Sequence, residues 1–290
     1  MRRASWTVLP LLLCACGPKV VPVPAAAPTI EEVPVVQVTP QPLQGRIWRS
    51  SDGTFVEEAT VVEALRGADV VLLGEKHDNP EHHQLQGRLI SALQADSVAF
   101  EMLDAGDVFD AATTADELAQ AVAWDDSGWP EFDLYRPVFD AVFASGARPV
   151  AAHPTGDQVS AVMSEGMETL GEAAEGLAVD RAPVDGHLAS LQQEIVDAHC
   201  GYADPQLTSM MVSAQVLKDA WMARTLAELG PKSVLVAGNG HTRPDRGVPS
   251  YLDASAAVVS FREVQPGELD PAADVDGGAD FIWFTDRLDN

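Results

Sequence analysis

Two short segments of the chain share the pattern of a glycine, two other residues and a histidine. They are Gly74 to His77 and Gly238 to His241, and each follows a short apolar run. Imidazole exchanges protons near neutral pH, and its neutral form also binds transition metals. If the fold brings the two loops together, they supply two groups suited to acid–base or metal chemistry.

Further glutamates and histidines follow other apolar runs. Glu75 lies two residues before His77, whereas Glu101 and His153 come directly after separate runs. Carboxylates with imidazoles suit zinc, manganese or iron, and such an ion could activate water for hydrolysis. The same groups could instead act as a general acid–base pair without a metal, and a His or Tyr beside an apolar cleft could ligate haem iron. The spacing does not decide among a metal site, an acid–base pair and a haem site. The residues expected at the site are Glu75, His77, Glu101, His153 and His241.

The elements that must position these residues are short apolar strands alternating with helices. Such alternation predicts an α/β fold with a mostly parallel central sheet flanked by helices, and in such sheets ligands bind at the carboxyl ends of the strands. A stretch at about 155–230 holds several helices and no strong strand, which indicates a helical insertion or cap. The strands are expected at 70–73, 97–100, 148–152, 233–237, 256–261 and 281–285, a hairpin at 46–57, and helices at 58–66, 80–93, 134–145, 155–166, 183–199 and 205–229.

The first residues have the features of a bacterial lipoprotein leader. Arg2 and Arg3 precede an apolar run that is too short to span a bilayer and ends in Leu13-Cys14-Ala15-Cys16. We therefore expect a signal peptide at 1–15 and lipidation of Cys16, which places the protein at the bacterial cell envelope. Its contact with the membrane is expected through the lipid anchor only, on the outer membrane facing the periplasm or the exterior.

The composition after the leader separates a tether from a folded domain, and it argues against nucleic-acid binding and a disulfide framework. Residues 16–44 are rich in Pro, Val and Ala and predict an extended tether, followed by a domain at 45–290 with its core at 58–262. The net charge of −26 argues against nucleic acid as a partner. The chain has three cysteines, of which two lie in the leader, so a disulfide framework is also excluded.

Four segments resemble the ChaN-like haem-binding lipoproteins, a haem-binding uptake family in a superfamily with Tiki-type metalloproteases and erythromycin esterases. They are LGEKHDNPEHHQLQ at 73–86, VAFEML at 98–103, AQVLKDAWMA at 214–223 and AGNGHTRPDRGVPSYL at 237–252. The resemblance spans about 45–262. It implies a domain that binds haem at the envelope for iron uptake, in a homodimer that pairs haems, with an outer-membrane haem receptor as a further partner.

The resemblance also implies roles for particular residues. Haem ligation in the family involves Tyr, which here means Tyr135, Tyr202 or Tyr251, with His83 as a further candidate. The superfamily's hydrolase positions correspond to Glu75, His77, Glu101 and His241, so a divalent-metal-dependent hydrolase is the alternative function. One departure is His153-Pro154, where the family usually has an Asn-type loop, and it makes the expected pocket more basic in its ligands.

Overall fold

The structure is a computed structural model, and it describes residues 42–181, 185–198, 204–273 and 277–288. These residues belong to one compact unit, Pro40–Asn290. The expected leader, Cys16, most of the tether and Tyr202 lie outside the described residues. Among the described helices, none is long and apolar enough to cross a membrane.

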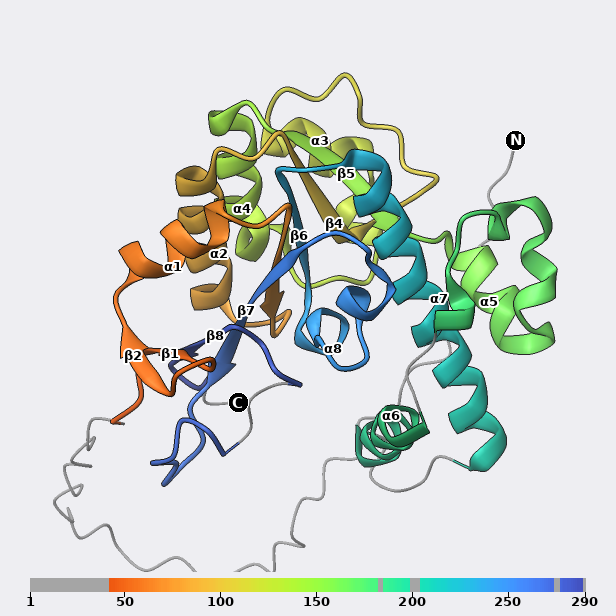
Figure 1. Cartoon of the computed structure of the whole chain (residues 1–290). Helices are drawn as coiled ribbons and strands as arrows, with labels where there is room; N and C mark the ends of the chain where they lie inside the picture. Colours follow the sequence, from red (N-terminus) through yellow and green to blue (C-terminus); the bar gives the residue numbers. More distant parts are fainter. Residues whose placement is uncertain (1–41, 182–184, 199–203, 274–276, 289–290) are drawn as a thin grey trace, which may run out of the picture. The chain divides into compact units, whose positions relative to one another are not determined.

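The centre of the unit is one mixed sheet with the order β2-β1-β8-β7-β3-β6-β4-β5. The run from β8 to β5 is parallel, whereas β1 is antiparallel to both β2 and β8. Figure 1 shows the sheet between two layers of helices. The strands are β1 Ile47–Arg49, β2 Thr54–Val56, β3 Val70–Glu75, β4 Ser97–Asp104, β5 Arg148–His153, β6 Ser233–Gly238, β7 Ala256–Glu263 and β8 Phe281–Thr285.

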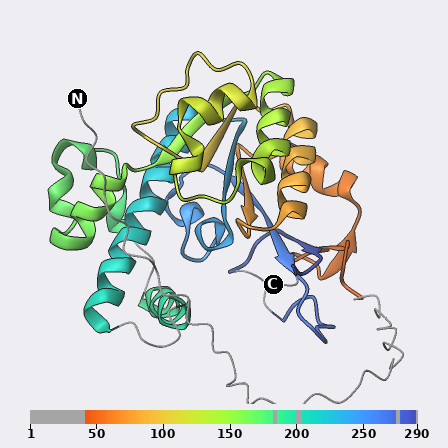
Figure 2. The ribbon, with the colours of Figure 1, turned by 180° about the vertical axis from the view of Figure 1, so that it is seen from behind.

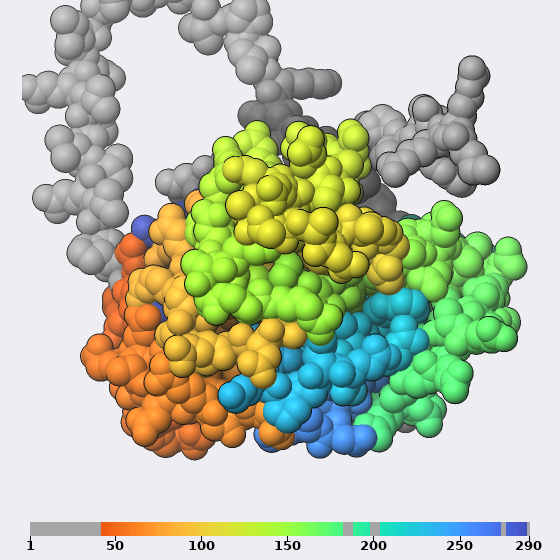
Figure 3. Space-filling view, turned by 90° about the horizontal axis from the view of Figure 1, so that it is seen from above, coloured from red at the N-terminus to blue at the C-terminus, as the bar shows by residue number. Residues whose placement is uncertain are grey.

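Helices cover both faces of this sheet. Helices α1, α2 and α4 lie on one face and α7 on the other, as the view from behind also shows (Figure 2). Seen from above, the yellow-to-lime segment between β4 and β5 lies beside the cyan segment that includes the end of α7 (Figure 3). The helices are α1 Glu58–Arg66, α2 Pro80–Leu93, α3 Ala115–Ala121, α4 Phe132–Ser145, α5 Gly156–Glu165, α6 Asp185–Ala198, α7 Pro205–Leu229 and α8 Asn239–Thr242, with short 3-10 turns at Trp124–Asp126, Met167–Ala174, Val179–Arg181 and Val248–Tyr251.

The apolar strands are buried on both faces because each successive side chain points to the opposite side of the sheet. In β3, Val71 and Leu73 join the core beneath α2 and α4, whereas Val70 and Leu72 join the core beneath α7. A strand that is apolar at every position is what a doubly covered parallel sheet requires. The central strands can therefore hold polar residues at their ends without losing their packing.

The expected α/β fold with a mostly parallel sheet is confirmed, and so is the hairpin, as β1 and β2. The expected insertion corresponds to α5, α6 and α7, with no strand among its described residues. Its helices differ in position, however. Helix α7 packs directly on β4, β5 and β6, so it is a layer of the fold, whereas α5 and α6 pack against α7.

Candidate functional site

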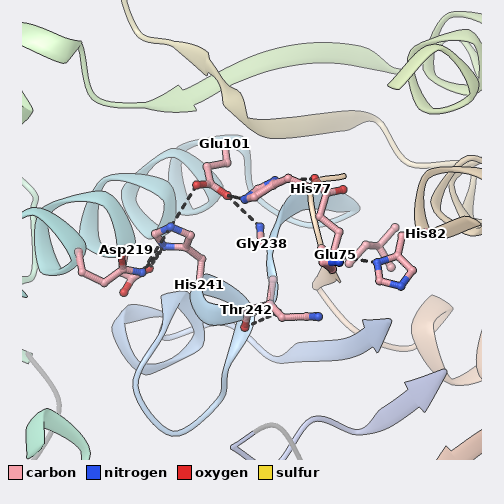
Figure 4. A network of polar contacts seen from close by, with 12 residues as sticks. Glu75, His77, His82, Glu101, Asp219, Gly238, His241 and Thr242 are labelled. Carbon is pink, nitrogen blue, oxygen red and sulfur yellow. Dashed lines mark hydrogen bonds and ion pairs between the residues drawn. The ribbon is translucent and has the colours of Figure 1, made fainter. Parts of the chain in front are cut away.

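The two Gly-x-x-His loops meet at the carboxyl ends of adjacent parallel strands. Strands β3 and β6 are paired so that Glu75 lies opposite Gly238. The chain leaves β3 toward His77 and leaves β6 into the short helix α8, which contains His241. Figure 4 shows that the side chains of His77 and His241 both point toward Glu101.

The first glycine of each loop, Gly74 or Gly238, lies against side chains of the other loop or next to it. A Cβ at Gly238 would lie 2.8 Å from His77 Nε2, and a Cβ at Gly74 would lie 2.3 Å from Asn239 Oδ1 and 2.4 Å from Thr242 Oγ1. All three contacts are shorter than 3.0 Å, a distance at which a neighbouring atom would have to shift to admit a Cβ. The glycines of the motif are therefore explained by the close approach of the two loops.

Five side chains form a continuous row of alternating acids and imidazoles across this edge. His77 Nδ1 lies 2.8 Å from Glu75 Oε1, and His77 Nε2 lies 3.7 Å from Glu101 Oε2. The other oxygen of Glu101 lies 3.1 Å from His241 Nε2, and His241 Nδ1 lies 2.5 Å from Asp219 Oδ1. We call this row, Glu75–His77–Glu101–His241–Asp219, the acid–imidazole row.

The charges in the buried half of the row stabilise one another. Burial alone would lower the pKa of His241, but Glu101 and Asp219 outweigh it and raise that pKa to about 10. Burial would raise the pKa of Glu101, but His241, His77 and the N–H that Gly238 donates to its carboxylate hold it well below the ordinary value. Burial raises the pKa of Asp219 to about 6 in spite of the nearby imidazolium. Near neutral pH, His241 is therefore an imidazolium between two carboxylates.

The other half of the row opens toward solvent at His77. Burial would lower the pKa of His77, but its bond to Glu75 and the charge of Glu101 raise it. Glu75 is fully buried and also accepts a hydrogen bond of 2.7 Å from the Tyr135 hydroxyl. The His77 side chain keeps 33 % of its surface exposed and packs against Trp129 at a ring-centre distance of 4.9 Å. His77 is thus the member of the row that a ligand can reach.

The row borders a cavity of about 960 Å³ between the strand ends and the inserted helices. Helix α6 contributes Leu191, Glu194 and Ile195 to its wall, and α7 contributes Met211 and Gln215. The remaining lining comes from the ends of β3, β6 and β7, the segments that follow them and the start of α2, and it includes the cations Lys76, Arg246 and Arg262. The volume is sufficient for a drug-sized or cofactor-sized molecule.

The structure brings four of the five expected site residues together and leaves His153 apart. His153 ends the edge strand β5, which β4 and β6 separate from β3, and its Nδ1 lies 3.0 Å from Asp104. With strands about 4.8 Å apart, three spacings place β5 roughly 14 Å from β3. Among the described residues, no group of three His, Cys, Asp or Glu lies so that it could hold a metal ion, and the expected metal site stays a prediction.

Among the expected haem ligands, the described ones are buried. Tyr135 and His83 are both 0 % exposed, and Tyr251 is 5 % exposed. Burial raises the pKa of both phenols further above their ordinary value, so neither is prepared to bind iron as a phenolate. Burial also lowers the pKa of His83, whose Nε2 lies 3.1 Å from the His77 carbonyl oxygen. The role of Tyr202, outside the described residues, stays a prediction.

Neighbouring His82 has a structural role at the start of α2. Its Nδ1 accepts the Lys76 backbone N–H at 2.9 Å, and its Nε2 lies 2.8 Å from Thr285 Oγ1. Burial lowers its pKa to about 4, so the ring is neutral. The Asn79 side chain caps the same helix by accepting two backbone N–H groups. These bonds hold the first Gly-x-x-His loop in place.

Two residues of the site were missed by the sequence analysis. Asp219 and Gln215 lie one turn apart on α7, and the Gln215 amide lies 2.8 Å from the same His241 nitrogen that Asp219 contacts. The available signal was a pair of polar residues at i and i+4, which lie on the same face of a helix. A buried Asp requires a partner, but the burial of Asp219 follows only from the structure, so this pair was not a sufficient signal.

Comparison with known proteins gives one family. The sequence model described as haem-binding uptake, Tiki superfamily, ChaN matches residues 61–252, which is well over half of the chain. Among curated proteins, none matches the sequence significantly. The match covers both Gly-x-x-His loops and all of the acid–imidazole row.

One solved structure shows the same fold, and two others resemble the chain more loosely. ChaN of Campylobacter jejuni, described with cofacial haem binding, has a TM-score of 0.68 and 23% identity, covering 82% of this chain and 95% of that one. The type III effector HopBA1 has a TM-score of 0.43 and 15% identity over 79% of this chain and 93% of its own. RRSP, a toxin effector domain from Vibrio vulnificus, has a TM-score of 0.41 and 15% identity over 80% of this chain and 38% of its own. The first likeness establishes the fold, and the other two are too loose to carry an argument.

Proposed function

Because the chain belongs to the haem-binding uptake family of the Tiki superfamily, ChaN, we propose that it binds haem in the course of haem or iron uptake. The observation that carries this proposal is the family match over residues 61–252. The cavity of about 960 Å³ beside the acid–imidazole row agrees with it in size. The homodimer, the lipid anchor at Cys16 and the outer-membrane receptor stay predictions from the sequence.

We further propose Tyr202 as the residue that would ligate the haem iron. The other two tyrosines, Tyr135 and Tyr251, are buried with raised pKa values, and a phenol must lose its proton to bind ferric iron. The alternative ligand is His77, whose ring is partly exposed and whose Nδ1 is bonded to a carboxylate. That second bond is typical of metal-ligating histidines, because it orients the ring and raises the basicity of the other nitrogen.

Titration of the full chain with haemin tests both proposals. We expect a saturable shift of the Soret band in the wild type, and Tyr202→Phe should weaken binding at least about tenfold, which corresponds to about 1.4 kcal/mol. Tyr251→Phe is the matched control, because the buried Tyr251 hydroxyl has no hydrogen-bond partner among the described residues. If His77→Gln weakens haemin binding and Tyr202→Phe does not, the iron ligand is His77 instead of Tyr202. Absence of saturable binding at micromolar haemin would contradict haem binding itself.

A second candidate function is hydrolysis of an ester or peptide in the same cavity. The observation that favours it is the acid–imidazole row, in which Glu75 orients His77 and His77 faces the cavity. An imidazole held in this way is suited to act as a general base on water. The side chains as they lie do not form a metal site, so this candidate is argued from acid–base chemistry alone.

Hydrolysis of a nitrophenyl ester and of a generic peptide mixture tests this candidate. If it is correct, His77→Gln should lower the rate about 100-fold, the effect expected for loss of a general base. His153→Gln serves as the control, because His153 pairs with Asp104 away from the row. Wild-type protein that hydrolyses neither substrate faster than His77→Gln would remove this candidate. A stoichiometric zinc, manganese or iron ion in never-chelated protein would point instead to metal-activated water.

A further inference from the structure

Arg246 is a buried cation with an unused donor, and it lines the same cavity as the acid–imidazole row. The residue is 2 % exposed, and its Nε has no hydrogen-bond partner among the described residues. A guanidinium presents five N–H donors in a planar fork, and a buried donor that is left unpaired costs free energy. Arg246 therefore lacks an acceptor that something in the cavity could supply.

Among the described residues, the two side-chain partners of Arg246 both come from α6, the helix that forms one wall of the cavity. Its Nη1 donates to the Ser190 hydroxyl at 3.0 Å, and its Nη2 is paired with the carboxylate of Glu194. The Glu194 side chain is 55 % exposed. A half-exposed carboxylate on a helix wall is a weakly held partner for a buried guanidinium, because water competes for it.

The Glu194 carboxylate lies directly over the second Gly-x-x-His loop. The position of a Cβ at Gly240 would be 3.7 Å from Glu194 Oε1, and the next residue along the loop is His241. An anion at this place is therefore close both to Arg246 and to the row. In a chain with a net charge of −26, an anionic ligand needs such a local cation to bind at all.

We propose that Arg246 binds a carboxylate of the ligand that enters this cavity, and that this carboxylate displaces Glu194. Arginine and a carboxylate form paired, parallel hydrogen bonds, which would satisfy the free Nε together with an Nη. In the absence of a ligand, the Glu194 carboxylate occupies this position and keeps the guanidinium of Arg246 paired. If the carboxylate is a haem propionate, the subsite depends on the proposed haem binding. If it is the carboxyl terminus of a peptide, the subsite does not depend on haem binding.

The test of the chemistry uses benzoate and its neutral analogue benzamide on the full chain. We expect benzoate, and not benzamide, to shift the NMR signal of the Arg246 Nε–H saturably. Glu194→Gln should strengthen benzoate binding about threefold to tenfold, because the internal competitor loses its charge. Glu228→Gln is the matched control, since Glu228 is 72 % exposed and pairs with Arg224 outside the cavity. The proposal would be overturned if benzoate left the Arg246 signal unchanged. It would also be overturned if Glu194→Gln and Glu228→Gln increased the affinity for benzoate equally.

Two further pairs of ligands identify the source of the carboxylate. If the carboxylate is a haem propionate, haemin should bind more tightly than its dimethyl ester, and Glu194→Gln should increase this difference in affinity. A peptide source predicts the same preference for a tripeptide with a free terminus over its amide. Arg246→Gln should abolish whichever preference the wild type shows. Failure of all haemin binding contradicts the proposed function only, because the benzoate experiment decides the subsite separately.

Discussion

The substitution Glu101→Gln should lower the free energy of unfolding by about 3–5 kcal/mol at pH 7, the cost of removing one partner from a buried ion pair. Glu101 is 3 % exposed and lies between His77 and His241. The amide keeps an oxygen for the Gly238 N–H but removes the negative charge that His241 faces. The imidazolium would then have only Asp219 as a charged partner, or would have to give up its proton.

Urea denaturation of the full chain measures this loss, with Glu63→Gln as the control. Glu63 is exposed on α1, so its substitution should change the free energy of unfolding by less than about 0.5 kcal/mol. The penalty of Glu101→Gln should also shrink at pH 10, where His241 is partly deprotonated in the wild type. A penalty below about 1 kcal/mol, or one that is the same at both pH values, would contradict the buried charges assigned to the row.

The stability of the wild type should fall by about 4 kcal/mol between pH 7 and pH 10, at roughly 1.4 kcal/mol per pH unit. The cause is His241, whose pKa is raised from 6.5 to about 10 in the folded protein. A raised folded-state pKa gives stability that is fully present below pH 6.5 and is lost as the pH rises toward 10. The raised pKa of His77 acts in the same direction.

Other groups of the site titrate outside this window. Glu75 and Glu101 have lowered pKa values and are ionised well below pH 7, and Asp219, at about 6, has lost most of its proton by then. The raised pKa values of Tyr135 and Tyr251 act only above pH 10. The decline between pH 7 and pH 10 is therefore specific to the imidazoles of the row.

Two measurements check this pH dependence. Denaturation at several pH values should show the decline in the wild type and a much flatter profile in His241→Gln. If that variant is too unstable, the NMR titration of the His241 ring in the wild type decides alone, and its midpoint should lie near 10. A midpoint between 6 and 7 would show that Glu101 and Asp219 do not hold the proton on His241.

Element bounds were predictable wherever the chain carries its own start signal. Helices α2 and α7 begin at Pro80 and Pro205, as the sequence predicts, because proline suits the first turn of a helix. The pattern of strands and helices likewise predicted that Glu75 and His241 follow strands and share one edge of the sheet. The observed clustering of the row agrees with this expectation, while the role of its residues stays a prediction.

The parts that the sequence did not predict depend on long-range packing. Strand order is not encoded in any local pattern, so His153 was expected beside Glu75 and His77, although β5 lies three strands from β3. Asp219 and Arg246 reach the site only because α7 and the loop after α8 fold back onto it. Burial is similarly non-local, which is why Tyr135 was a haem-ligand candidate by sequence although its hydroxyl is bonded to Glu75 inside the protein.

The most direct test of haem binding is the amount of haem that the wild-type full chain retains. The protein is incubated with excess haemin and passed over a gel-filtration column, and the haem of the protein peak is determined as its pyridine complex. We expect about one haem per chain, as predicted for a member of this haem-binding uptake family. Protein that leaves the column without haem, in a run where a haem-binding control protein keeps its own, would contradict the proposed function.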